Sequence, residues 1–164
     1  ANELALQSTN KIYKDTDSFF TGTHIYASDT NIPTGMAVEL SSGKVALAST
    51  SNSKICVGVV TLCKELGADE VHSTSLGSDV TGGYICRLAS VGDPLDRQCT
   101  GFNVCNENGD IQPGDLLVTS STPGYLMKQS DDIIKSITVG KAMEAVTFDT
   151  NGQATGVYGF LYCG

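Results

Sequence analysis

The sequence predicts a mainly β protein, made of duplicated β-hairpin units that form a small sandwich or barrel and preceded by an extended N-terminal arm. Three observations support this fold class: the composition, a series of short strands between turn-forming residues, and an internal repeat. Of 164 residues, 51 are Gly, Ser or Thr, while 40% are apolar and 17% are charged. A disordered chain would be less hydrophobic and more charged, and a helical bundle would be richer in Ala, Glu, Lys and Leu. The composition therefore favours a turn-rich, ordered β domain.

Short strands account for the apolar residues better than helices do. Few windows place apolar residues at the i, i+3, i+4 and i+7 positions of an amphipathic helix, whereas short runs rich in Val, Ile, Thr and Tyr are frequent. These runs are separated by Ser-Ser-Gly, Gly-Gly, Asn-Gly and Pro-Gly, which are turn formers. In chain order, we expect strands near residues 23–27, 36–40, 44–48, 55–62, 84–88, 101–105, 115–119, 125–128, 137–145 and 156–162.

The internal repeat contains two copies of one hairpin unit. The first copy covers residues 32–45 and is followed by a Val-Gly element at 53–60; the second covers 111–125 and is followed by one at 136–142. The aligned positions are Gly35 with Gly114 and Ser41-Ser42 with Ser120-Ser121 at an offset of 79, and Gly58 with Gly140 at an offset of 82. Each copy predicts a hairpin and a third strand, whose glycine lets another backbone or a ring approach closely. Chance resemblance between two Gly- and Ser-rich segments is the alternative.

The repeat suggests four segments: an arm at 1–22, a first β unit at 23–62, an acidic insert with short strands at 63–110, and a second β unit at 111–164. In the arm, apolar residues are spaced through polar ones, a pattern that needs another surface to lie on. These residues are Leu4, Leu6, Ile12, Tyr13, Phe19 and Phe20. The surface belongs either to a partner or to the arm's own domain.

The charge distribution excludes several partners. The net charge is −8, and residues 61–110 contribute −5 of it, with three Lys or Arg against eight Asp or Glu. A nucleic-acid-binding protein needs a basic surface, so DNA and RNA are not expected partners. No run approaches 18 apolar residues and no basic-then-apolar leader is present, so we expect neither a membrane span nor a secretion signal. Because the chain begins with Ala1, we expect removal of an initiator Met and synthesis in a cytoplasm.

The six cysteines leave two interpretations open. They are Cys56, Cys63, Cys86, Cys99, Cys105 and Cys163, and their spacings fit no zinc or redox motif, so we expect no metal site. Cys56 and Cys86 lie in strand-like runs, where a free thiol behaves as a small hydrophobe. Disulfides are the alternative, with Cys99 and Cys105 as the first candidate pair, and six cysteines allow 15 pairings.

Motifs for catalysis or cofactor binding are weak. There is no Gly-x-Ser-x-Gly elbow, and a dyad of Cys63 and His72 is the one nucleophile and base pair that can be imagined. The Gly-Lys at 43–44 lacks the rest of a phosphate loop and predicts a hairpin turn. Residues 106–110 offer oxygen ligands for calcium but lack the closing Glu, so a plain turn is the competing interpretation. We therefore expect no catalytic, cofactor-binding or metal-binding residues.

Two stretches resemble known families. The sequence GDLLVTSSTPGYLMK at 114–128, with VGKAME at 139–144, resembles a β module of bacteriophage tail fibres and other virion appendages. The earlier sequence PTGMAVELSSGKV at 33–45, with ICVGVV at 55–60, is similar to small phage head decoration (cement) proteins. The resemblance covers roughly half of the chain and leaves out the arm and residues 63–110. It implies a β-rich, commonly trimeric structural protein of a virus particle that has no catalytic residues.

The resemblance and the short chain together favour a phage head decoration protein. Such a protein is expected to be made in the host cytoplasm, to form a homotrimer and to bind the major capsid protein on the outer surface of the virion. The arm residues expected to contact the capsid or a neighbouring subunit are Leu4, Leu6, Tyr13, Phe19 and Phe20. A structural module of a tail fibre or tail spike is the alternative, and a hydrolase or sugar-binding enzyme is a third possibility from a different class.

Overall fold

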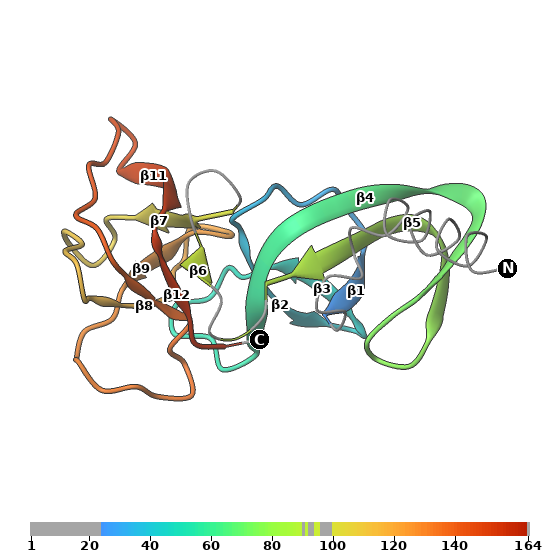
Figure 1. The fold of residues 1–164 in the computed structure, drawn as a ribbon, viewed down its shortest axis with the longest axis horizontal. Helices are drawn as coiled ribbons and strands as arrows, with labels where there is room; N and C mark the ends of the chain where they lie inside the picture. The colour runs from blue at the N-terminus through green and yellow to red at the C-terminus, as the bar shows by residue number, and fades with distance from the viewer. Residues whose placement is uncertain (1–23, 90, 92–93, 96–99, 164) are drawn as a thin grey trace, which may run out of the picture.

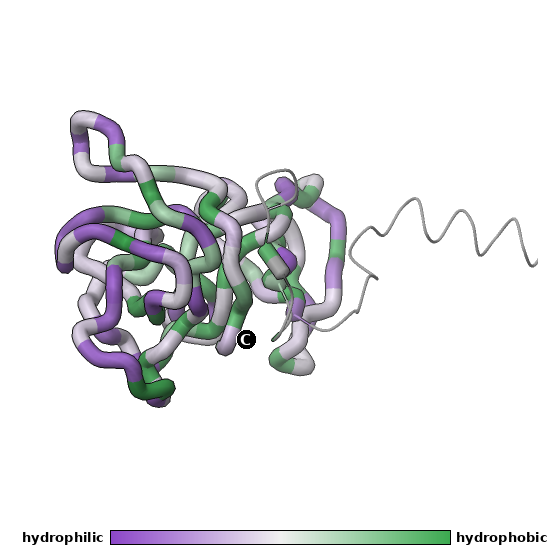
Figure 2. Tube along the Cα trace, turned by 60° about the vertical axis from the view of Figure 1, so that its left-hand side comes forward, coloured by the Kyte–Doolittle hydropathy of each residue, from purple (hydrophilic) through white to green (hydrophobic). Residues whose placement is uncertain are grey.

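A computed structural model describes residues 24–89, 91, 94–95 and 100–163. These residues form strands and turns, which confirms the mainly β fold (Figure 1). The strands are β1 Ile25–Ser28, β2 Ala37–Ser41, β3 Lys44–Leu47, β4 Cys56–Ser73, β5 Asp79–Leu88, β6 Pro94–Leu95, β7 Phe102–Cys105, β8 Leu116–Thr119, β9 Leu126–Lys128, β10 Gly140–Ala142, β11 Gln153–Val157 and β12 Gly159–Leu161. Along the described chain, short apolar stretches alternate with polar ones (Figure 2), as expected for strands with one buried face.

The first unit is a closed barrel with the strand order β1-β3-β2-β4-β5. Its hairpin β2–β3 turns at Ser42 and Gly43, where sequence analysis predicts a turn. Strand β5 closes the barrel because it pairs with both β4 and β1. Inside lie Ile32, Val38, Val45, Val60, Cys86 and Leu88, all buried.

The second unit is a seven-stranded sheet with the order β11-β7-β9-β8-β10-β12-β6. Strand β11 pairs with β7 near one edge of this sheet, and β12 pairs with β10 near the other. Only Tyr158 separates β11 from β12 in sequence, so this one segment connects the two edges. Apart from the added β6, the path repeats the first unit, with β7, β9, β8 and β10 in the places of β1, β3, β2 and β4. Even the parallel pair recurs, as β1 with β3 and β7 with β9.

The strand register shows that the repeat is structural. In the first unit Val38 pairs with Gly58, and in the second Leu117 pairs with Gly140. Leu117 and Gly140 are the residues reached by the sequence offsets of 79 and 82. The neighbouring pairs, Ala37 with Val59 and Leu116 with Lys141, obey the same offsets. Because register is set independently in each sheet, this agreement favours duplication over chance resemblance.

Strands β4 and β5 are longer than the sequence patterns indicate. The strand expected at 55–62 continues to Ser73, across the predicted boundary at residue 62, and the strand expected at 84–88 begins at Asp79. Together they form a curved ribbon (Figure 1) with a register shift between Leu66 and Val71. Gly82 and Gly83 adopt positive φ within β5, so glycines that suggest a loop in the sequence permit an irregular strand. The segment 63–110 thus supplies strands to both units.

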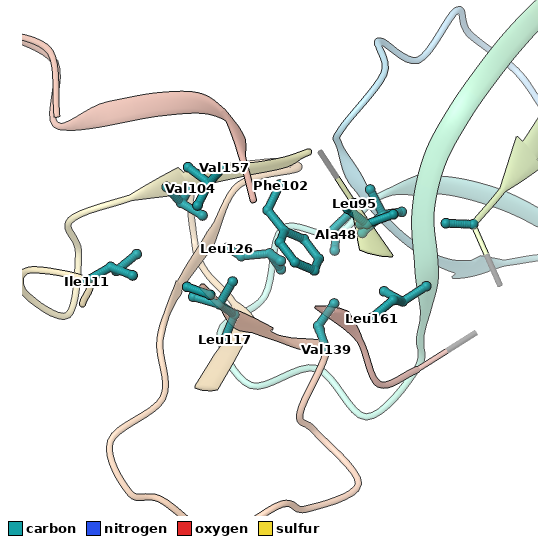
Figure 3. Packing of buried hydrophobic residues seen from close by; sticks show 14 residues of the cluster. Ala48, Leu95, Phe102, Val104, Ile111, Leu117, Leu126, Val139, Val157 and Leu161 are labelled. Atoms are coloured by element: carbon teal, nitrogen blue, oxygen red, sulfur yellow. The ribbon is translucent and has the colours of Figure 1, made fainter. Parts of the chain in front are cut away.

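One core cluster extends through both units. Ala37, Ala48, Val59 and Ala89 come from the first unit, and Phe102, Val104, Ile111, Leu117, Leu126, Val139, Ala142, Val157 and Leu161 come from the second, with Leu95 of β6. Figure 3 shows the Phe102 ring pointing into the middle of this cluster. The ring packs against Gly140 so closely that a Cβ there would lie 2.5 Å from Phe102 Cζ. This confirms the prediction that the Val-Gly strand admits a ring at its glycine.

Candidate contact surface at the free end of the second unit

The hairpin turn of the second unit docks on one end of the first unit. Gly124 lies against Met36 and Leu47, and a Cβ at Gly124 would be 2.6 Å from Met36 Sδ. The Gly124 N–H donates to the carbonyl of Ala48 (2.8 Å), and the Ala37 N–H donates to the carbonyl of Gly124 (2.9 Å). The contact is therefore apolar in its side chains and hydrogen-bonded in its backbone, like the interior of one domain.

Thr119 makes a second contact across the same joint. Its side chain is fully buried, and its hydroxyl donates to the carbonyl of Thr50 (2.7 Å) while accepting the N–H of Ser53 (2.7 Å). The Asn52 N–H also donates to the carbonyl of Thr119 (3.1 Å). The loop 49–55 of the first unit is thereby fixed to the second unit. We call the face of the first unit formed by residues 35–37 and 47–55 its docking end.

The second unit has an equivalent docking end at residues 114–116 and 128–138. The backbone is the same in both: the Ala48 N–H donates to Ala37 O in the first unit, and the Gln129 N–H donates to Leu116 O in the second. No described part of the chain occupies this second end as the turn at Gly124 occupies the first. Conversely, the turn of the first unit at Gly43 is exposed, with open space around a Cβ placed there.

Polar side chains replace the apolar ones at the free docking end. Met36, Leu47 and Ala48 of the first unit correspond to Asp115, Lys128 and Gln129 of the second by the offsets of 79 and 81 that the paired strands show. Lys128 Nζ lies 3.4 Å from Asp115 Oδ2, so an ion pair stands where the first unit presents apolar side chains. Beside it is an open polar hollow of about 510 Å³, lined by Asn108, Gly109, Asp110, Gln112, Lys128, Gln129 and Ser130.

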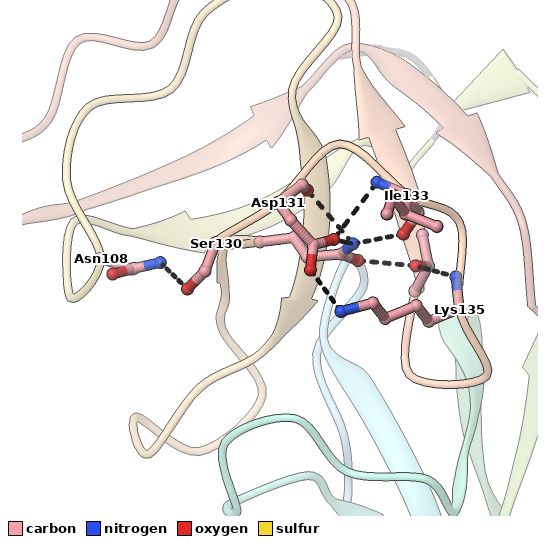
Figure 4. Close-up of polar contacts among 7 residues, drawn as sticks. Asn108, Ser130, Asp131, Ile133 and Lys135 are labelled. Atoms are coloured by element: carbon pink, nitrogen blue, oxygen red, sulfur yellow. Dashed lines mark hydrogen bonds and ion pairs between the residues drawn. The ribbon is translucent and has the colours of Figure 1, made fainter.

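The loop 129–138 presents two isoleucines to solvent at this end. Ile133 and Ile134 are each 64% exposed. Buried Gln129 holds the loop: its Nε2 donates to the Ile133 carbonyl (2.6 Å) and to Asp131 Oδ1 (2.9 Å), and its Oε1 accepts from the Thr138 hydroxyl (2.6 Å) (Figure 4). An ion pair joins Asp131 to Lys135. The hydrogen bond from Lys135, followed by that from Gln129, holds the pKa of the Asp131 carboxyl below its ordinary value.

This arrangement has the chemistry of a protein contact surface. Two adjacent apolar side chains sit on a loop fixed by internal hydrogen bonds, and charged residues surround them, as in the apolar centre and polar rim of an interface. A fixed loop loses little conformational entropy when a partner covers it. Full burial of an isoleucine contributes about 1.5–3 kcal/mol. Other exposed large apolar residues are Leu40, Ile55, Leu62, Val71, Leu76, Val91 and Met143.

The contact residues expected from the sequence belong to the N-terminal arm. Leu4, Leu6, Tyr13, Phe19 and Phe20 fall outside the described residues. Sequence analysis missed Ile133 and Ile134, although a signal was present. Two adjacent isoleucines between Asp131-Asp132 and Lys135-Ser136 are flanked by polar residues on both sides, which is unusual for core residues in so short a loop.

Cys63 and His72, the nucleophile and base pair considered from the sequence, do not form a catalytic dyad. The Cys63 thiol lies against Cys86 and the carbonyl of Thr30, whereas His72 Nδ1 lies 2.8 Å from the carbonyl oxygen of Ser73. Each side chain is engaged with another group, so neither activates the other.

The oxygen-rich segment 106–110 supports a turn. The Glu107 carboxylate accepts hydrogen bonds from the Ser121 and Thr122 hydroxyls, both at 2.7 Å, and Asn108 Nδ2 donates to the carbonyl of Lys128. Desolvation raises the pKa of Glu107, but the hydrogen bonds from Ser121 and Thr122 together outweigh it and keep the pKa below its ordinary value. Glu107 therefore stabilises the turn that enters the joint between the units, while Asn108 contacts the free docking end through Lys128.

Three further observations concern the chain as a whole. Within the described ranges, no three His, Cys, Asp or Glu side chains are grouped as a metal site would need. The same ranges contain no helix with the length and hydrophobicity required to cross a membrane. Comparison of the chain with protein-family models, curated proteins and solved structures finds no match. The geometry of the free docking end is therefore the main guide to function.

Proposed function

We propose that this chain is a bacteriophage head decoration (cement) protein that binds the outside of the capsid and stabilises the shell by bridging capsid subunits. The observation that carries the proposal is the free docking end of the second unit, where a hydrogen-bonded loop presents Ile133 and Ile134. The sequence resemblance to phage decoration proteins supports the same conclusion. In this proposal the protein has no catalytic role.

Bridging requires at least two contact regions on one molecule. The free docking end supplies one, and the arm, with Leu4, Leu6, Tyr13, Phe19 and Phe20, supplies the other. Apolar area buried at each junction stabilises the assembled shell relative to the dissociated subunits. Assembly as a homotrimer would multiply these contacts, because the second and third copies bind at a high effective concentration once the first is attached. The net charge of −8 makes the capsid protein a better partner than DNA.

Reconstitution on capsids that lack the protein tests the proposal. The variant Ile133→Ser/Ile134→Ser should weaken binding by roughly tenfold or more, measured by co-sedimentation and by the heat resistance of loaded capsids. The matched control is Leu62→Ser/Leu76→Ser, two exposed apolar residues of the first unit that lie outside its docking end. Equal losses in both variants would remove the assignment to the docking end. A variant without residues 1–20 that still loads fully and protects capsids would remove the arm from the mechanism.

A tail-fibre or tail-spike module is the second candidate, because the second copy of the repeat carries that resemblance more strongly. Antibody labelling of virions separates the two: label on the head supports decoration, and label confined to the tail supports the fibre. Sedimentation of the purified protein measures whether it is a trimer. Clear turnover in a glycoside-hydrolysis screen would favour an enzyme instead.

A further inference from the structure

The fold brings four of the six cysteines together as two sulfur pairs. Cys63 of β4 and Cys86 of β5 are directly opposite each other, and their Sγ atoms are 2.9 Å apart. Directly opposed residues of antiparallel strands have Cα atoms about 4.5 or 5.5 Å apart, according to their position in the ladder. Both separations fall within the range of about 4.4–6.8 Å that a disulfide accepts. The backbone at Cys63 and Cys86 is therefore already placed for a bond between their sulfurs.

The second pair is far apart in sequence. Cys56 begins β4 in the first unit, and Cys163 follows β12 in the second. Both side chains pack against the core cluster that extends through the two units, and their thiols are hydrogen-bonded to each other. This pair therefore lies where the C-terminal end of the second unit meets the first unit.

We propose that Cys63–Cys86 and Cys56–Cys163 are two disulfide-forming sites, selected by the fold from the 15 pairings that six cysteines allow. The inference is independent of the proposed function. Cys105, which is buried, and Cys99, which lies outside the described residues, remain as the other two cysteines. The alternatives of free thiols and disulfides thus become two oxidation states of one defined arrangement.

The oxidation needs an acceptor of two electrons for each bond, and a small disulfide such as oxidised glutathione serves. The thiolate of one cysteine attacks that disulfide, forms a mixed disulfide and releases one reduced thiol. The thiolate of its partner then attacks the protein sulfur of the mixed disulfide and releases the second reduced thiol. Each protein disulfide therefore consumes one small disulfide and yields two small thiols, with the two protein protons accounted for in those thiols.

The surroundings of the four sulfurs affect how each pair reacts. The hydrogen bond from Cys163 lowers the pKa of Cys56 despite burial, while the hydrogen bond with Cys56, followed by burial, raises the pKa of Cys163. In the other pair, burial and then Cys63 raise the pKa of Cys86, whose side chain is fully buried. Cys63 is half-buried and Cys86 fully buried, so a small disulfide reaches Cys63 first and Cys86 resolves the mixed disulfide. Cys56 and Cys163 are both half-buried, and either can react first.

Each bond would constrain a different part of the fold. Cys63–Cys86 fixes β4 to β5 at the strand pair that closes the barrel and continues into the ribbon. Cys56–Cys163 connects the two units through a loop of more than 100 residues. Because cross-links lower the entropy of the unfolded chain, oxidation should raise Tm by on the order of 10 °C.

Non-reducing peptide mapping of the full chain tests the proposal. The protein is equilibrated with oxidised glutathione, alkylated and cleaved with trypsin, which cuts after Lys and Arg. Cys56 and Cys63 share the peptide 55–64, Cys86 lies in 65–87, and Cys163 lies in 142–164. We expect these three peptides to be joined together. In Cys63→Ser only 65–87 should be released, and in Cys56→Ser only 142–164 should be released. Reduced samples of both variants are compared by circular dichroism and Tm to verify folding.

Several results would overturn the proposal. One is a different connectivity, such as a link from 65–87 to the peptide that contains Cys105. Another is full alkylation of all six thiols after glutathione treatment that oxidises a short dithiol control peptide. A third is release of both partner peptides in each serine variant. An unchanged Tm in a protein shown to be oxidised would leave the connectivity in place but remove its stabilising role.

Discussion

Replacing Gly140 with alanine tests how the core is built around Phe102. Gly140 belongs to the third strand of the second unit, and the Phe102 ring packs directly on it. An added Cβ would lie 2.5 Å from Phe102 Cζ and 2.6 Å from the carbonyl oxygen of Phe160. Both distances are well below van der Waals contact between heavy atoms, which is about 3.5–4.0 Å for carbon pairs. The methyl group therefore cannot enter unless the ring or the neighbouring strand moves.

The structure sets the expected magnitude. Adding a methylene to a well-packed core costs about 1–3 kcal/mol, and occasionally more. The upper part of that range applies here, because the Phe102 ring is fully buried and the second atom belongs to the backbone of a paired strand. We expect Gly140→Ala to lower the free energy of unfolding by about 3 kcal/mol. For a chain of this size, that loss corresponds to a fall in Tm of about 6–12 °C.

Urea unfolding and calorimetry measure the effect, and Gly67→Ala is the matched control. Gly67 is also a strand glycine without a positive φ, but the atoms nearest to its added Cβ are 3.8 Å away. The control should change stability by less than about 1 kcal/mol. In a double-mutant cycle, Gly140→Ala should lower the free energy of unfolding less in a Phe102→Leu background than in the unchanged protein, since the smaller side chain removes one of the two clashes. Equal stability of Gly140→Ala and Gly67→Ala would refute this account of the core.

Three further predictions concern the joint and its turn. Thr119→Val should lower the free energy of unfolding by about 2 kcal/mol in urea titrations, because it leaves the buried Ser53 N–H without its acceptor. Leu47→Lys places a charge under the docked turn and should lower the free energy of unfolding by about 3 kcal/mol or more. This loss is smaller where the ammonium group reaches solvent. Glu107 has a lowered pKa in the folded state, so its stabilisation is complete above the ordinary glutamate pKa of about 4.3 and declines as pH falls through the lower folded value. The Tm difference between the protein and Glu107→Gln should therefore narrow below about pH 4.

Local chemistry explains why much of the fold was predictable from the sequence. The hairpin turns depend on adjacent residues, as at Ser42-Gly43, and the offset of 82 between Gly58 and Gly140 correctly anticipates equivalent positions in two sheets. The long ribbon was not predictable, because Gly82 and Gly83 indicate a loop until the partner strand is known. Closure of the barrel by β5 was also not predictable from local sequence, since the pairing of β5 with β1 joins residues about 60 positions apart.

The candidate site required comparison of the two units in space. Residue by residue, Lys128 and Asp115 are ordinary surface charges. The strand register shows that they occupy the positions of Leu47 and Met36, which contact the turn at Gly124 in the first unit. The polar neighbours of Ile133 and Ile134 indicate a loop, but the way in which buried Gln129 fixes that loop with both side chains exposed depends on tertiary structure.

The unlike docking ends of the two units determine which face can receive the turn of another unit. A joint that links the turn of one unit to the face of the next has no built-in stop, and linear arrays of this kind end where a terminal unit carries polar residues. The ion pair of Lys128 and Asp115, with buried Gln129 beside it, gives the second unit such a polar face. Restoring Leu, Met and Ala at these positions would prepare the face to receive a third unit fused to the C-terminal end. A few side chains thus decide whether this face can receive another unit, and a longer stack becomes a problem of sequence design.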